Sequence, residues 1–119
     1  MEDDGASHEL TLERPEISLH AILGLRTPEM MRVLGTLTHE VVTVLIDSGS
    51  SHNFVSKQIA KKAGLQTISN GHLEVMVASG ERLVSLGKCV QTQLNLQGYP
   101  IVMDFYLLPI EGYDVILGT

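Results

Sequence analysis

Hydrophobic and polar residues alternate along most of the chain after residue 15, in short stretches separated by glycines and turn residues. A period of two is typical of β-strands with one buried face. The run 40–46 is instead almost continuously hydrophobic and β-branched, which predicts a strand buried on both faces. The pattern predicts strands over 16–23, 30–37, 40–46, 72–78, 82–86, 88–96, 99–108 and 114–117.

One stretch has helical spacing. Ser56 is a favourable N-cap, and Ile59, Ala60 and Ala63 give the following turns one apolar face. Gly64 stands where a left-handed residue commonly ends a helix. Many short strands with one short helix predict an all-β fold, a small closed barrel.

The composition fits one small domain without cross-links. The chain has 119 residues, of which 44% are hydrophobic, enough for a core of its own. Its one cysteine, Cys89, lies in an alternating stretch, which predicts a core or half-buried position and excludes an internal disulfide. Neither a signal peptide nor an apolar run long enough to span a bilayer is visible. We therefore expect no membrane contact and an intracellular, cytoplasmic location.

Negative charge is concentrated at the start of the chain. Of the formal net charge of −6, residues 1–16 carry −5. We therefore expect residues 1–15 to form an acidic, flexible leader and residues 16–119 to form the domain. The domain is nearly neutral, whereas phosphate binding needs clustered positive charge, so no nucleic-acid partner is expected. Lys57, Lys61 and Lys62 are expected to form a solvated face of the predicted helix.

A single carboxylate ends the most hydrophobic predicted strand. Asp47 directly follows residues 40–46, and Ser48, Gly49 and Ser50 come next. A charged group at the end of a buried strand is costly unless hydrogen bonds or a function compensate, and serine hydroxyls can supply such bonds. Asp-Ser-Gly is also ordinary turn chemistry. The residue types therefore leave both a functional carboxylate and a capped turn open.

Other catalytic signatures are not met. His39-Glu40 begins like the zinc motif H-E-x-x-H, but Thr43 stands where the second histidine is required. The sequence contains no nucleophile elbow and no phosphate-binding glycine loop.

The segment 44–56, Val-Leu-Ile-Asp-Ser-Gly-Ser-Ser-His-Asn-Phe-Val-Ser, resembles the active-site segment of retropepsin-type aspartic proteases. The similarity is closest to the variant in gypsy-type LTR retrotransposon polyproteins of plant genomes. It continues through 59–65, resumes at 75–80, which resembles the family's flap hairpin, and closes at 113–118, which resembles its apolar-apolar-Gly strand. Residues 16–21 are similar to the segment that leads into the protease domain in this family. The Asp-Ser-Gly motif and the apolar-apolar-Gly motif stand in the family's order, and Gly118 follows Asp47 by 71 residues.

The resemblance implies an aspartic endopeptidase whose catalytic group is Asp47. Only one Asp-Ser-Gly is present. The two carboxylates that this chemistry needs would therefore come from two chains, each supplying Asp47 to a homodimer. The ionised member would activate a water, and the protonated member would polarise the scissile carbonyl. The implied chemistry needs neither a metal nor an organic cofactor. The implied substrate is an extended polypeptide, and the implied role is the processing of a polyprotein.

Supporting roles follow from the same resemblance. Active-site loop residues would support Asp47, the flap tip would close over the peptide, and the last strand would pack behind the loop. These residues are Ser48, Gly49 and Ser50 in the active-site loop, Ala78, Ser79 and Gly80 in the flap, and Ile116, Leu117 and Gly118 in the last strand. Asp114 is expected to be structural.

Two alternatives remain beside the active enzyme. In the family the chain usually continues past this glycine into a helix and a strand that joins the dimer sheet, whereas this sequence stops at Thr119. We expect either that the sequence is a trimmed form of a longer chain or that strand 16–23 carries the interface. Without enough interface, the chain would be monomeric and inactive at low concentration. The main alternative is a catalytically inactive retropepsin-like dimerisation or peptide-binding module. The other is an unrelated small barrel in which Asp47 caps a turn by chance.

Overall fold

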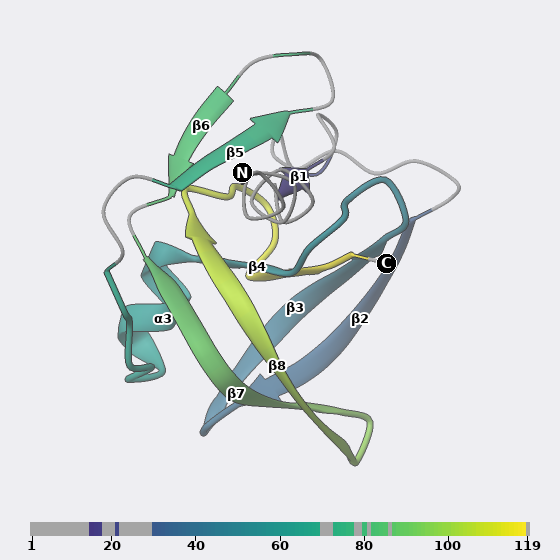
Figure 1. The fold of residues 1–119 in the computed structure, drawn as a ribbon. Helices are drawn as coiled ribbons and strands as arrows, with labels where there is room; N and C mark the ends of the chain where they lie inside the picture. Colours follow the sequence, from purple (N-terminus) through teal and green to yellow (C-terminus); the bar gives the residue numbers. More distant parts are fainter. Residues whose placement is uncertain are drawn as a thin grey trace, which may run out of the picture.

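A closed barrel and a small sheet make up the described part of the chain (Figure 1). The computed structural model describes residues 15–17, 21, 30–69, 73–77, 80, 82–85 and 87–118. Its elements are β1 (Glu16–Ile17), β2 (Met30–Leu37), β3 (Glu40–Asp47), β4 (Phe54–Ser56), α3 (Lys57–Lys62), β5 (Leu73–Val77), β6 (Arg82–Ser85), β7 (Lys88–Leu96), β8 (Tyr99–Leu108) and β9 (Val115–Leu117). The barrel has the strand order β2-β3-β9-β4-β8-β7, and the sheet has the order β1-β5-β6. The predicted fold class, an all-β barrel with a short helix, is confirmed.

Two long antiparallel hairpins form most of the barrel wall. β2 and β3 pair over their whole length, so that Met30 lies opposite Asp47. β7 and β8 form the second hairpin. Their connections use left-handed residues, with φ of 58° at Thr38 and 89° at Gly98, as tight hairpin turns require.

The short strand β9 is inserted between β3 and β4. It runs parallel to β3, with Ile116 opposite Leu45, and antiparallel to β4, with Ile116 opposite Phe54. Because β3 and β4 are consecutive in the chain, the loop 48–53 that joins them has to pass the end of β9. The residue after β9, Gly118, is thereby brought against this loop.

Helix α3 begins and ends as the sequence predicts. The Ser56 hydroxyl accepts a hydrogen bond from the Ile59 N–H at 3.1 Å. Gly64 has a φ of 70°, and the next residue, Leu65, donates its N–H to the Ala60 carbonyl at 2.9 Å. The helix packs against β4 and β8, so it closes the side of the barrel rather than the end at which β3 finishes.

Two apolar clusters lie on opposite faces of β3, because side chains alternate along a strand. Val44 packs inside the barrel with Phe105. Leu45 belongs to the second cluster, which reaches Val75 of β5 and so joins the barrel to the β1-β5-β6 sheet. Asp47 lies two residues beyond Leu45 and therefore shares its face. The alternation thus directs the carboxylate toward the space between barrel and sheet.

Two strand predictions differ from the structure. Of the predicted strand 16–23, only Glu16–Ile17 is extended among the described residues, and Ala21 is helical. β3 was expected to be buried on both faces, but Val41 is 70% exposed. The second cluster covers its face of the hairpin only toward the end of the strand.

Cys89 is fully buried, which confirms its predicted core position. Burial raises the pKa of its thiol, and a contact with the Thr67 hydroxyl opposes that rise. The thiol therefore stays protonated and unreactive at neutral pH. Within the ranges that the structure describes, no helix is long and apolar enough to cross a membrane.

Candidate active site

Asp47 is the last residue of β3, and its side chain is held on both oxygens. Oδ1 accepts a hydrogen bond from the Gly49 N–H at 2.9 Å, and Oδ2 accepts one from the Ser50 hydroxyl at 2.8 Å. The residue is only 2% exposed. These bonds compensate for burying the carboxylate and fix the direction in which it points. They are the bonds of a capped turn, but they also provide the orientation that a reacting carboxylate needs.

Two of the three loop residues predicted to support Asp47 are hydrogen-bonded to its side chain. Gly49 contributes its backbone N–H, and Ser50 contributes its hydroxyl while being itself buried. Ser48 is exposed next to Asp47. The resemblance assigns Ser48 a contact with the loop of a second chain, and that role stays a prediction.

Gly118 lies directly behind the loop 48–53. A Cβ atom at this position would stand 2.3 Å from the Ser50 carbonyl oxygen and 2.5 Å from that of His52. Only glycine allows the two backbones to approach this closely. The Gly118 N–H also donates to Asn53 Oδ1 at 3.1 Å. Ile116 and Leu117 are buried in β9 on either face, so this strand supports the loop from beneath.

The flap prediction falls partly outside the described residues, since Ala78 and Ser79 are among those not described. β5 and β6 form an antiparallel pair in which Met76 lies opposite Arg82, and their role as a flap stays a prediction. Gly80 is exposed, has a φ of 103°, and donates its N–H to the Val77 carbonyl at 2.8 Å. Its backbone therefore makes a tight turn that favours glycine.

Comparisons with known proteins identify the family to which the chain belongs. Residues 20–119 match the family model described as "Retroviral aspartyl protease". The chain belongs to this protease family. Along 89 residues it is 26% identical to the Protein DDI1 homolog of Leishmania major, a match that covers 75% of this chain and 23% of that protein. This chain therefore spans well under half the length of that relative.

A solved structure shows the same fold. The crystal structure of the retroviral protease-like domain of Ddi1 from Leishmania major matches with a TM-score of 0.62 at 24% identity, over 77% of this chain and 74% of that one. At this identity the likeness establishes the fold of the family, and the roles of individual residues rest on the site's own geometry.

Asp114, expected to be structural, anchors β9 to β3. Its Oδ2 accepts hydrogen bonds from the Thr43 N–H at 2.8 Å and the Thr43 hydroxyl at 3.1 Å. Its own N–H donates to the Thr43 carbonyl at 3.0 Å, and its carbonyl accepts from the Ser56 N–H at 2.9 Å. Asp114 thus fixes where β9 enters the barrel, four residues before the end of β3.

Replacing Asp114 by alanine should lower the free energy of unfolding by about 1–3 kcal/mol, because the partly buried Thr43 groups lose their acceptor. Urea denaturation measures this change. Asp104→Ala is the control: Asp104 also accepts a backbone N–H, from Gln91 at 2.7 Å, but at an exposed site. The loss there should be smaller, and equal losses would contradict the anchoring role.

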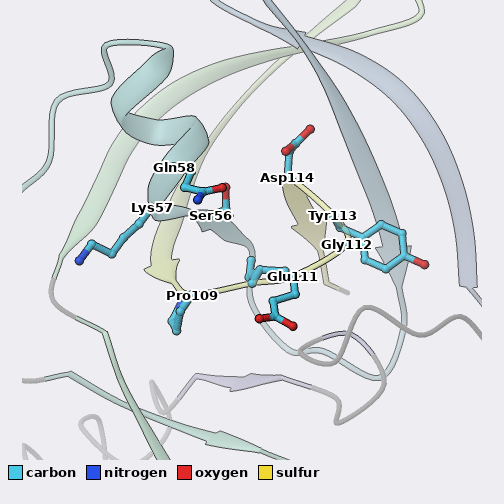
Figure 2. A pocket seen from close by; sticks show the side chains of 9 residues that line it. Ser56, Lys57, Gln58, Pro109, Glu111, Gly112, Tyr113 and Asp114 are labelled. Carbon is cyan, nitrogen blue, oxygen red and sulfur yellow. The ribbon is translucent and has the colours of Figure 1, made fainter.

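One cavity lined by described residues lies away from Asp47. It has a volume of about 590 Å³ and lies between the start of α3 and the segment 109–114 (Figure 2). Asp114 lines it and pairs with Thr43, which places the cavity about 13 Å along β3 from Asp47 at the usual strand rise. This cavity is therefore not part of the candidate site.

A second cavity, of about 530 Å³, lies beside the active-site loop. His52, Asn53 and Gly118 line one side of it, and Tyr106 and Asp104 line the other. The His52 ring meets the Tyr106 ring edge-on, with 5.7 Å between the ring centres. In the described part of the chain, no group of three or more His, Cys, Asp or Glu side chains is placed to hold a metal ion.

Two residues of this region make contacts that the sequence did not predict; the Ser51 hydroxyl was expected to orient the Asp47 carboxylate and binds Glu16 instead. Asn53 receives the Gly118 N–H, and Ser51 binds the backbone of Glu16. Both bonds join segments that are distant in the chain, by 65 and 35 positions. The sequence does contain one indication of these contacts. Residues 48–53, between Asp47 and the apolar strand β4, are polar or glycine, and this stretch is longer than a tight turn requires.

Proposed function

We propose that this protein is an aspartic endopeptidase that acts as a homodimer. The observation that carries the proposal is the Asp47 carboxylate at the end of β3, held by Gly49 and Ser50 and backed by Gly118. Each chain supplies one such carboxylate. Two chains related by a twofold axis bring the two Asp47 side chains together.

The chemistry follows from the pairing of two carboxylates. At close range both cannot carry a charge, so the pair retains one proton. The ionised Asp47 takes a proton from a water molecule, which attacks the peptide carbonyl. The protonated Asp47 donates a hydrogen bond to that carbonyl oxygen, and a proton then passes to the leaving amine. Within each chain the bonds to Gly49 and Ser50 keep both oxygens in place during these transfers.

The substrate we propose is an extended segment of polypeptide. Such a segment binds by adding a strand to an existing sheet edge, and apolar pockets select its side chains. The hairpin of β5 and β6 would close over it as a flap and exclude water. The resemblance of segments 44–56 and 59–65 to gypsy-type elements supports polyprotein processing, in the cytoplasm, as the biological setting.

A peptide-binding module without turnover is the second candidate. It is favoured by one observation: Ser51 and β5 hold the extended segment β1 through backbone hydrogen bonds that do not involve Asp47. Such binding would survive the loss of the carboxylate, whereas hydrolysis would not.

Cleavage of an unfolded protein mixture between pH 3 and pH 7 tests the enzymatic proposal. We expect activity that is highest in acid, because the pair of carboxylates has to retain one proton, and that rises more steeply than linearly with protein concentration. A flat pH profile would contradict the shared proton. A cleavage rate strictly proportional to protein concentration, far below micromolar, would contradict assembly of the site from two chains.

A further inference from the structure

The strand β1 lies between the flap hairpin and the active-site loop, and both of its edges are bonded. On one side Glu16 donates its N–H to the Ser51 hydroxyl at 2.9 Å and accepts the Ser51 N–H at 2.9 Å. On the other side β1 pairs in parallel with β5, where the Met76 N–H donates to the Pro15 carbonyl at 3.1 Å. Residues 15–17 therefore bridge the strand β5 and Ser51 of the loop 48–53.

The side chain after Glu16 fills an apolar pocket. Ile17 is fully buried and lies opposite Val77 of β5. It belongs to the second cluster, together with Phe54 and Tyr106 from the barrel. The segment thus makes the two kinds of contact by which a peptide strand is recognised: backbone bonds along an edge and a side chain in a pocket.

The edge that β1 occupies is the one that a substrate needs. A strand in a sheet has two edges, and β6 takes one edge of β5 through pairs such as Val75 with Leu83. A peptide that adds to β5 while lying against the active-site loop has only the edge facing Ser51. In this structure Glu16 and Ile17 hold that edge.

We propose that residues 15–17 are an internal competitor of the substrate. This inference rests on the proposed function, because it concerns how the same site is regulated. The segment has to leave the edge of β5 before an extended peptide can bind there. The observed affinity for peptides is then the intrinsic affinity multiplied by the fraction of chains in which this edge of β5 is free. When the segment leaves, a branched aliphatic side chain of the bound peptide takes the place of Ile17 in its pocket.

Peptide binding tests the competition without requiring hydrolysis. A fluorescent peptide copying residues 13–20 is titrated with full-length protein carrying Asp47→Asn, and anisotropy gives Kd. Adding Ile17→Ala should lower Kd about fivefold or more, because the internal segment loses its buried side chain. Glu16→Pro should also lower it, since proline has no N–H for the Ser51 hydroxyl. Glu16 is exposed, so this variant decides the matter if Ile17→Ala does not fold.

Leu94→Ala is the matched control, because Leu94 is equally buried but lies in the cluster inside the barrel. It should lower stability and leave Kd unchanged. The proposal is overturned if folded Ile17→Ala and Glu16→Pro bind the peptide no better than their parent, or if Leu94→Ala improves binding as much. Tighter binding by both variants, with no cleavage by forms retaining Asp47, would uphold this proposal and reject the proposed function.

Discussion

Asp47→Asn should remove peptide hydrolysis while leaving the fold intact. The amide cannot take a proton from water, so the rate should fall by at least about 10²–10⁴-fold. Its oxygen can still accept the Gly49 N–H, and the Ser50 hydroxyl can turn to accept from the amide. Cleavage assays give the rate, and circular dichroism with urea denaturation gives the fold and the stability.

Asp104→Asn provides the control for this substitution. It makes the same chemical change at a carboxylate that is exposed and ion-paired with Lys88 at 3.7 Å. Its activity should stay within about twofold of the wild type, because surface ion pairs contribute little. Hydrolysis that persists in Asp47→Asn, in a preparation as active as the control, would rule out Asp47 as the reacting group.

Gly118→Ala should damage both stability and activity. The added methyl group would meet two backbone oxygens of the active-site loop at 2.3 Å and 2.5 Å, and backbone cannot turn aside as a flexible side chain can. We expect a loss of about 3 kcal/mol in the free energy of unfolding. Displacement of the loop that carries Asp47 should reduce the rate by a further factor on the order of 10².

The same change at Gly64 separates these two effects. Gly64 has a φ of 70° and open space where the methyl group of an alanine would stand, so alanine there costs about 1–2 kcal/mol for its left-handed backbone alone. Activity per folded chain should not change in Gly64→Ala. If it falls as far as in Gly118→Ala, loss of stability rather than displacement of the loop explains both variants.

Local patterns predicted most strand and helix boundaries. The bounds of β2, β7 and β8 agree with the alternation of residues, and Ser56 and Gly64 mark the ends of α3 as expected. These features depend on neighbours within a few positions. The insertion of β9 between β3 and β4 could not be read in this way, because strand pairing depends on which distant edges are free.

In the candidate site, too, local features could be predicted and contacts between distant segments could not. Asp47 was predictable because a charged residue directly follows an apolar strand, and Ser50 because its hydroxyl lies three residues away on the same turn. The roles of Ser51 and Asn53 depend on segments 35 and 65 positions distant. The pairing of β1 with β5 also joins segments that are distant in the chain. The alternation of residues 16–23 predicted a strand there but not its partner.

Mixing wild-type and Asp47→Asn chains tests the central claim most directly, namely that one active centre is built from two copies of Asp47. Total protein is held constant while the fraction of wild-type chains is varied, with time for chains to exchange. If only wild-type pairs are active, cleavage falls with the square of that fraction, to about a quarter in an equal mixture. A fall to only about a half would show that each chain works alone and would contradict the account.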